Sequence, residues 1–138
     1  MFNFNAKKML SKDMAIDLGT ASVIVYVDGK GIVLREPSVV AVDTDADCIV
    51  QIGKEAQAML GRNPDHINVI RPLKEGVISC YDVTQKMIQY YIRRASGNAF
   101  LPPRVIICIP SGVTEVEARA AVQNAITSGT ALNTLKVW

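Results

Sequence analysis

The sequence predicts a mixed α/β fold in which an antiparallel three-strand meander precedes helices and one buried strand. Short β-branched runs separated by turn residues follow one another between residues 14 and 42. An amphipathic helical pattern follows over residues 82–96. A continuous apolar run follows over residues 104–109, which is typical of a strand buried on both faces. With 138 residues and a mean hydropathy of +0.20, the chain can bury a hydrophobic core.

Charge and cysteine content narrow the classes of function. Lysine and arginine total 15, aspartate and glutamate total 13, and the net charge of +2 gives no reason to expect a nucleic-acid partner. No apolar run approaches the roughly 18 residues needed to span a bilayer. Three cysteines with no C-x-x-C spacing argue against a disulfide framework. We therefore expect a cytoplasmic protein with reduced thiols.

The first twelve residues differ from the rest because they mix apolar and basic residues and contain no acid. On a helix, Phe2, Ala6, Met9 and Leu10 would share one face, and the lysines would lie off that face. This pattern is typical of a short interfacial helix that binds an anionic membrane surface. The alternative is a frayed terminus, because a helix this short is marginal in water.

The β elements are expected in a regular order. A strand over residues 14–16 leads into the segment 17–22, and a β-branched run over residues 23–27 forms the next strand. Residues 28–31 are a hairpin turn signal. Further strands are expected at residues 32–34, 39–42, 48–52 and 67–70, and a loop is expected at residues 71–76.

Two groups of polar residues are expected to have no ligand. Asp43, Asp45 and Asp47 resemble the start of a calcium loop, but Cys48 and Lys54 stand where that loop needs glycine and glutamate, so we expect a solvated turn. His66 is the only histidine of the sequence, and we expect it in a loop or surface role.

Three helices are expected between and after these strands. Residues 53–60 predict a short helix that ends near Gly61. Asp82 is a candidate N-cap for the helix ending near residue 96, which Gly97 terminates. After the buried strand at 104–109, Thr114 and Glu117 form a capping box for a helix ending near residue 128.

The segment from Asp17 to Ser22 is the strongest candidate for chemistry. If the chain turns tightly here, the amides of Gly19, Thr20, Ala21 and Ser22 point into one concavity, which binds phosphate oxygens. The Asp17 carboxylate would then hold Mg²⁺ through water molecules. The alternative is an ordinary β-turn, because short glycine motifs also occur without a ligand.

Phe100 and Leu101 are apolar residues in a loop bounded by Gly97 and two prolines. Their spacing alone leaves two alternatives open. They pack under the preceding helix as part of the core, or they project into a membrane or partner.

Several stretches have a more specific pattern: residues 16–21 (IDLGTA), 31–34 and 36–41 (GIVL, EPSVVA), 70–73 and 76–78 (IRPL, GVI), and 104–106 and 109–114 (RVI, IPSGVT). Together they resemble the MreB family of rod shape-determining bacterial actin homologues, from about residue 13 to about residue 120. The first stretch is shared with the wider superfamily of actin, Hsp70 and sugar kinases, whereas the second and third are specific to MreB.

The resemblance implies an actin-like (ribonuclease H-like) ATPase domain whose cleft holds ATP and Mg²⁺. It implies filaments that lie on the inner face of the cell membrane and guide cell-wall synthesis, with the elongation machinery as a partner. Its first phosphate loop falls on residues 19–22, with Asp17 beside the metal. Ser22 stands where the family usually has asparagine, so we expect the backbone amides to make the contacts there.

The resemblance also places a membrane-insertion loop at residues 99–101, and it favours the N-terminal segment as a second anchor. Stable anchoring of this kind requires two weak signals. The predicted membrane residues are Phe2, Phe4, Met9, Leu10, Phe100 and Leu101.

The resemblance fades after residue 122, and the family is more than twice as long. We expect only the first lobe: a possible membrane segment at 1–12, the lobe at 13–128 with a small inserted subdomain at about 45–80, and a divergent tail at 129–138. The family's next strand, its water-positioning glutamate, its second phosphate loop and its adenosine loop are not expected here. A frameshift or a truncated gene copy would explain such a tail.

The sequence therefore predicts the N-terminal lobe of a cell-shape-determining filament protein, with no catalytic residue of its own and no meaningful ATP hydrolysis. The alternative is a non-catalytic fragment that binds membrane or filaments. A sugar kinase or Hsp70-type protein is less favoured, because those families do not share the stretch at 31–41.

Overall fold

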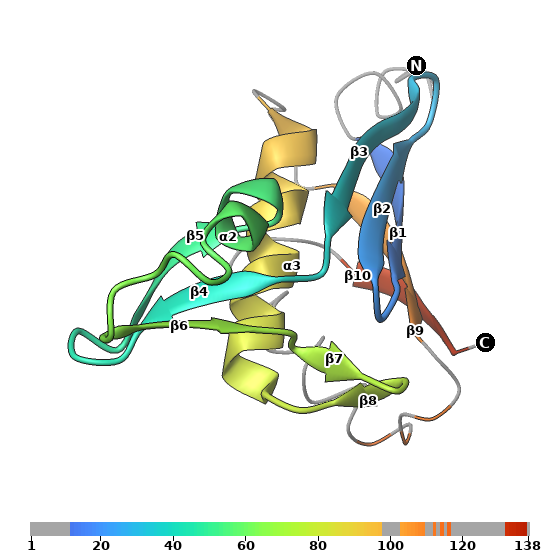
Figure 1. Cartoon of the computed structure of the whole chain (residues 1–138). Helices are drawn as coiled ribbons and strands as arrows, with labels where there is room; N and C mark the ends of the chain where they lie inside the picture. Colours follow the sequence, from blue (N-terminus) through green and yellow to red (C-terminus); the bar gives the residue numbers. More distant parts are fainter. Residues whose placement is uncertain are drawn as a thin grey trace, which may run out of the picture.

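The computed structural model describes residues 12–97, 103–109 and 132–137, together with the single positions 112, 114 and 116. Its elements are β1 (Asp13–Leu18), β2 (Ser22–Val27), β3 (Gly31–Pro37), β4 (Val40–Asp43), β5 (Cys48–Ile52), α2 (Lys54–Ala58), β6 (Ile67–Ile70), β7 (Leu73–Lys74), β8 (Val77–Ile78), α3 (Tyr81–Ser96), β9 (Arg104–Ile109) and β10 (Leu132–Val137). The predicted mixed α/β class is confirmed, with the sheets and α3 arranged as in Figure 1.

The main sheet has five strands in the order β10-β9-β1-β2-β3. Strands β1, β2 and β3 form the predicted antiparallel meander, with Met14 opposite Val27 and Val25 opposite Leu34. Strand β9 pairs with β1 in parallel, with Ile16 opposite Ile107. Parallel pairing requires a long crossover, which the small sheet and α3 provide between β3 and β9.

Helix α3 covers one face of the main sheet, and the core lies between them. Alternate residues of β1, β2 and β9 point into it, because successive side chains of a strand point to opposite faces. Ile16, Val25 and Ile107 are fully buried, as are Met87 and Ile88 of α3. This single layer of packing provides the hydrophobic core of the lobe.

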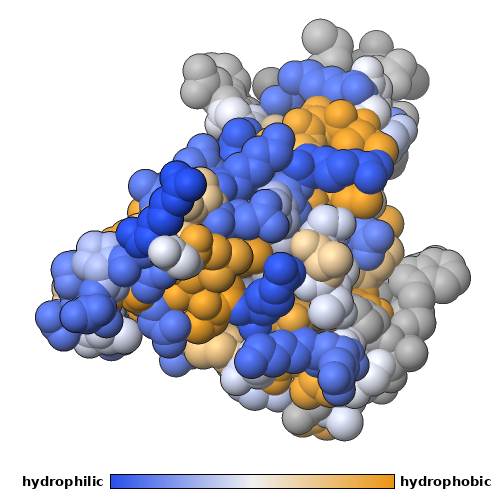
Figure 2. Space-filling model, in the orientation of Figure 1, coloured by the Kyte–Doolittle hydropathy of each residue, from blue (hydrophilic) through white to orange (hydrophobic). Residues whose placement is uncertain are grey.

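The opposite face of the main sheet is more open. Tyr26, Ile32 and Ile106 are exposed, and Figure 2 shows apolar side chains at the surface over the upper part of β3. The prediction that residues 104–109 are buried on both faces is therefore wrong for this face, where Ile106 is 41% exposed. Alternate residues of β9 pack on the α3 side, and the residues between them lie on the more open face.

A second, small sheet has the order β5-β4-β6, and α2 packs against it. The residues of β4, expected to follow the meander, leave the main sheet and begin this one. Val39, Ala41, Ala56 and Ile67 form its own buried cluster. The division of the chain at residue 45 stays a prediction, and β4 lies before that boundary.

Two local predictions are wrong. Asp82 is not the N-cap of α3: Cys80 occupies that position without a side-chain hydrogen bond, and Asp82 lies in the first turn. There its negative charge still complements the helix dipole. Residues 71–76, expected as a loop, contribute to a hairpin of two short strands, β7 and β8, with Leu73 opposite Ile78. Strands of two residues carry too few side chains for a period to be visible.

Strand β10 lies in the segment expected to be a divergent tail, where no further strand of the fold was expected. It pairs in parallel with β9, Leu135 lying opposite Ile107, and extends the main sheet by one strand. The register shifts between Leu132 and Thr134, which interrupts the alternation that would reveal a strand in the sequence. The helix predicted for residues 114–128 lies outside the described residues, except at positions 114 and 116.

The turn between β4 and β5 depends on the Asp43 carboxylate. Its Oδ1 accepts hydrogen bonds of 2.9 Å from the amides of Asp45 and Ala46. The Ala46 bond is the largest cause that lowers the pKa of Asp43, with a smaller contribution from Asp45. The three aspartates of this turn are thus part of a solvated turn, as the sequence predicts, and not a calcium loop.

We expect the stabilising contribution of Asp43 to be lost in acid. Because the pKa of Asp43 is lower in the folded than in the unfolded chain, the contribution is present above the unfolded value and disappears as pH falls through the folded value. Urea unfolding of Asp43→Asn and the parent, between neutral pH and about pH 3, should show two curves that converge in acid. Asp45→Asn is the control, since Asp45 contributes its amide; a difference that persists in acid would contradict this role.

Candidate phosphate-binding site

The turn between β1 and β2 holds the residues predicted to bind phosphate. The amide of Gly19 donates to the carbonyl of Ser22 at 3.1 Å, which closes the turn. A Cβ on residue 19 would lie 2.7 Å from that same carbonyl oxygen, closer than real Cβ atoms approach. Glycine is therefore required here for the close approach of two backbone segments. Its amide is bonded within the turn, so Gly19 shapes the site in this structure.

Thr20 and Ala21 form the tip of the turn. Within the described part of the chain, the amides of these two residues have no hydrogen-bond acceptor. Successive amides in a tight turn form a concavity that binds anions. The turn thus presents two donors of the kind that the sequence predicts, contributed by Thr20 and Ala21.

Two neighbouring segments hold the turn in place. On one side, Ser22 pairs with Pro37 across the β2–β3 ladder, and the amide of Ser38 donates to the carbonyl of Ala21 at 3.0 Å. On the other side, the amide of Gly76, in the β7–β8 turn, donates to Thr20 Oγ1 at 3.3 Å. These contacts fix the tip from both directions, so its amides are held in position before any ligand binds.

Gly112, which follows β9 in the chain, lies against the β7–β8 turn. A Cβ on Gly112 would lie 3.2 Å from the carbonyl oxygen of Gly76, so the two backbones are in close contact. Gly76 therefore contacts both Thr20 and Gly112, although more than 90 residues separate those two positions in the chain. Sequence reasoning did not assign Gly76, Gly112 or Ser38 to the site. All three residues lie in the stretches that carry the family resemblance, and this is the sequence feature that points to them.

Asp17 is exposed on the face of the main sheet opposite α3, paired in register with Ile24 and Cys108. Among the residues that the structure describes, no three His, Cys, Asp or Glu side chains come together to hold a metal ion. A single carboxylate still fits Mg²⁺, which keeps most of its water molecules and takes its other ligands from phosphate. The assignment of Asp17 to the metal therefore stays a prediction.

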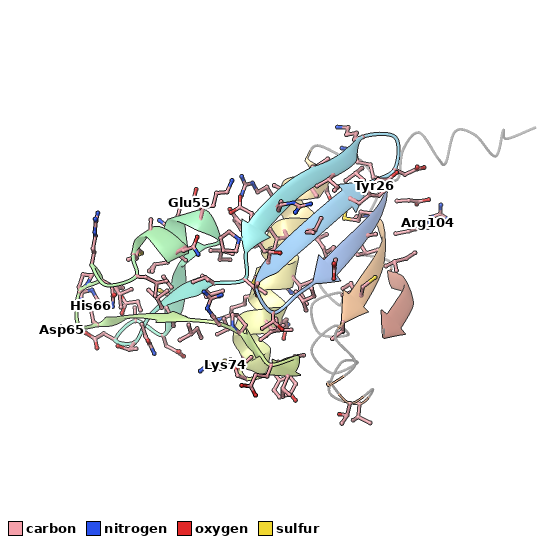
Figure 3. All side chains as sticks on the ribbon, turned by 45° about the vertical axis from the view of Figure 1, so that its right-hand side comes forward. Tyr26, Glu55, Asp65, His66, Lys74 and Arg104 are labelled. Atoms are coloured by element: carbon pink, nitrogen blue, oxygen red, sulfur yellow. The ribbon has the colours of Figure 1, made fainter. Side chains whose placement is uncertain are left out.

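Other candidate residues lie away from the turn. His66, expected in a loop or surface role, is exposed at the far end of the small sheet beside Asp65 (Figure 3). All three cysteines are free. The predicted membrane residues, Phe2, Phe4, Met9, Leu10, Phe100 and Leu101, lie outside the described residues. Across ranges 12–97, 103–109 and 132–137, no helix has the length and apolarity needed to cross a bilayer.

Comparison with solved structures defines the class of protein. The chain is similar to the Spiroplasma citri protein MreB5 bound to ADP, with a TM-score of 0.78 and 31% identity, over 93% of this chain and 38% of that one. MreB5 bound to AMPPNP matches with a TM-score of 0.75. MamK bound to AMPPNP matches with a TM-score of 0.71 at 18% identity, which shows the fold alone. The fold is therefore one lobe of an actin-like protein.

The sequence relatives identify the family. Residues 11–135 match the MreB/Mbl protein family. The chain is 50% identical over 127 residues to the cell shape-determining protein MreB of Haemophilus influenzae, covering 88% of this chain and 36% of that protein. It is 46% identical over 122 residues to Mbl of Bacillus cereus, covering 88% and 37%. The chain belongs to the MreB/Mbl family of cell shape-determining, actin-like proteins, and it spans little more than a third of the length of these relatives.

Proposed function

We propose that this chain is the nucleotide-phosphate-binding lobe of a cell-shape-determining filament protein that binds ATP with Mg²⁺. One observation carries the proposal: the amides of Thr20 and Ala21 have no acceptor among the described residues. Hydrogen bonds from the amides of Ser38 and Gly76 hold this turn in position. Two similar solved structures of MreB5, bound to ADP and to AMPPNP, support it.

The chemistry assigned to the turn is binding and orientation of an anionic phosphate chain. The amides of Thr20 and Ala21 would donate to phosphate oxygens, whose negative charge makes these hydrogen bonds stronger than neutral ones. Thr20 Oγ1 accepts from Gly76, which leaves its own proton available to donate to phosphate. Asp17 would hold Mg²⁺ through water, and the ion would neutralise phosphate charge.

Hydrolysis requires more than this turn. Phosphoryl transfer needs charge neutralisation, alignment and a positioned water molecule together. We expect weak phosphate binding and no meaningful ATP hydrolysis by this chain alone. The same proposal covers the whole protein. We expect it to assemble into filaments, to attach to the inner face of the cell membrane through the six predicted membrane residues, and to guide cell-wall synthesis.

Amide chemical shifts of the ¹⁵N-labelled chain, titrated with MgADP and with Mg-AMPPNP, test the binding site. We expect shifts at Thr20, Ala21 and Gly76 with a Kd on the order of 1 mM, or about −4 kcal/mol. Adenosine, which lacks phosphate, is the control and should leave these amides unchanged. No shift at these three amides at roughly ten times that concentration would refute the site and favour a non-catalytic membrane- or filament-binding fragment.

A further inference from the structure

The connection between the two sheets is very short. Strand β3 ends at Pro37 and β4 begins at Val40, so only Ser38 and Val39 join them on this side. Ser38 donates its amide to Ala21 of the candidate phosphate turn at 3.0 Å, and the carbonyl of Val39 accepts from the amide of Gly53 at 2.9 Å. The same two residues therefore contact both the turn and the residue that precedes α2.

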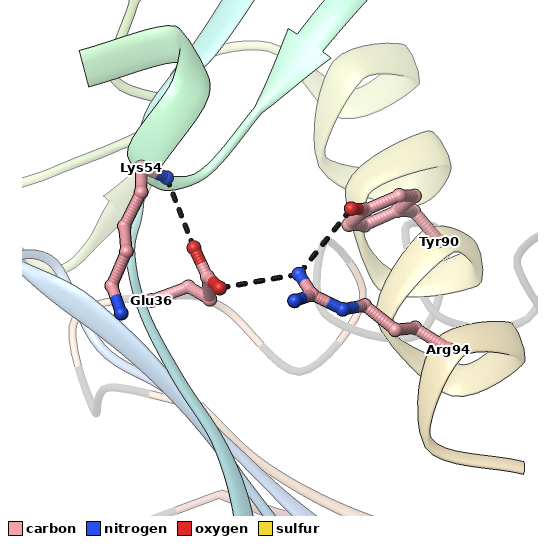
Figure 4. A network of polar contacts seen from close by, with 4 residues as sticks. All are labelled: Glu36, Lys54, Tyr90 and Arg94. Atoms are coloured by element: carbon pink, nitrogen blue, oxygen red, sulfur yellow. Dashed lines mark hydrogen bonds and ion pairs between the residues drawn. The ribbon is translucent and has the colours of Figure 1, made fainter. Parts of the chain in front are cut away.

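The Glu36 carboxylate links three elements at this connection: β3, α2 and α3. Only 5% of Glu36 is exposed, and its two oxygens have different partners (Figure 4). Oε2 accepts from the amide of Lys54, the first residue of α2, at 2.9 Å, and Oε1 accepts from Arg94 Nη1 of α3 at 3.1 Å. In this state Glu36 holds the start of α2 against β3 and α3. A buried carboxylate needs such partners, because an unpaired buried charge is costly.

A second donor lies close to the same carboxylate but is not used. The Tyr91 hydroxyl is buried and has no hydrogen-bond partner among the described residues. Oε2 of Glu36 and the Tyr91 hydroxyl lie 2.4 Å and 3.0 Å from the point where a Cβ on Gly53 would be, so they are at most 5.4 Å apart. Gly53 has no side chain to stand between them. Burial, and then the charge of Glu36, raise the pKa of Tyr91 above its ordinary value, so the hydroxyl keeps its proton.

We propose that Glu36 is a positioning residue with two alternative partners, which sets the attachment of the small sheet to the main sheet. In the first state, seen here, Oε2 accepts from the Lys54 amide. In the second state, Oε2 moves towards the Tyr91 hydroxyl and accepts from it. This movement takes Oε2 out of reach of the Lys54 amide, which is released together with the start of α2. Since Ser38 bonds to Ala21, the exchange is transmitted to the turn at residues 19–22, a consequence that rests on the proposed function.

Two features of the junction make the exchange physically reasonable. Gly53 has a φ of +76° and a ψ of −131°, a conformation that L side chains rarely adopt, and a glycine leaves such a conformation for others at less steric cost than any other residue. The Arg94 contact to Oε1 does not need to break, because the two oxygens of one carboxylate act separately. A buried hydroxyl without a partner is unfavourable, and the second state satisfies it.

Amide hydrogen exchange of the ligand-free chain tests this proposal without relying on nucleotide binding. Exchange reports local opening, and the Lys54 amide reports the contact directly. Glu36→Gln should accelerate exchange at Lys54 and in α2 by about tenfold, the effect of roughly one lost charge-assisted hydrogen bond, while β1 and β9 keep the parent rates. Tyr91→Phe should slow exchange at the same amides by about threefold. Without the Tyr91 hydroxyl, Oε2 of Glu36 has no second donor and stays bonded to the Lys54 amide.

Tyr90→Phe is the matched control, because Tyr90 is adjacent and its hydroxyl lies 3.4 Å from Arg94 Nη1. It should not slow exchange at Lys54. If Tyr91→Phe leaves the Lys54 exchange rate unchanged or raises it, the second state does not exist and the proposal is overturned. If Glu36→Gln unfolds the chain, Tyr91→Phe decides by itself, provided that exchange slows at Lys54 and in α2 while β1 and β9 keep the parent rates. Slower exchange in all of these elements would report only the removal of an unpaired buried hydroxyl, and it too would overturn the proposal.

Discussion

Replacing Ile107 with alanine is expected to lower the free energy of unfolding by about 2–5 kcal/mol. Ile107 is fully buried in β9, where it pairs in register with Ile16 of β1 and belongs to the core cluster that α3 covers. The smaller side chain would lose its transfer free energy and leave a cavity that the surrounding sheet cannot fill. Urea unfolding followed by circular dichroism, with the slope of the transition compared, measures the change.

Ile106 provides the matched control for this substitution. It is the neighbouring isoleucine in the same strand, but 41% of it is exposed on the opposite face of the sheet. Ile106→Ala should cost less than about 1 kcal/mol, because much of its side chain is already in contact with water. Equal losses for the two variants would contradict the assignment of the α3 side as the packed face.

The second large effect is expected from Gly19→Ala at the candidate phosphate turn. The new Cβ would lie 2.7 Å from the carbonyl oxygen of Ser22, and both atoms belong to backbone, so the turn must change shape. The backbone of Thr20 and Ala21 would then shift, and their two amides would shift with it. We expect the affinity for MgADP to fall by at least about tenfold, or 1.4 kcal/mol, measured by the amide chemical shifts of the remaining turn residues.

Gly61→Ala separates this effect from a general cost of replacing glycine. A Cβ on Gly61 meets no atom within 4 Å, although its φ of +73° makes the substitution strained. It lies between α2 and β6, away from the turn, and should leave MgADP affinity unchanged. Unaltered binding in Gly19→Ala would show that the turn does not contact the phosphates.

The elements with a clear period were predictable from the sequence. Strand β9 has the bounds that its apolar run predicts, and α3 ends at Ser96 before Gly97. The meander was predictable because its turns carry glycine and aspartate at the required positions. Strand β10 and the β7–β8 hairpin were not, since a register shift or a length of two residues removes the alternation.

The candidate site was predictable in part. The segment 17–22 has the residue types that a phosphate-binding turn requires, and the family resemblance points to the same place. The bonded amide of Gly19 and the contact of Gly76 with Thr20 could not be predicted, because each depends on where another backbone segment lies. Glu36 lies in a stretch that carries the family resemblance, but a buried carboxylate with two partners has no local sequence signal.

The sequence by itself determined the α/β class, the strand meander, the long helix and the family, since these follow from local periodicity and from residue identities along the chain. The tertiary structure decided which face of β9 is packed, which sheet receives β4, and which turns meet at residues 19–22. Those outcomes depend on contacts between residues far apart in the chain, and they are selected by burial and hydrogen bonding of the whole fold rather than by any one segment.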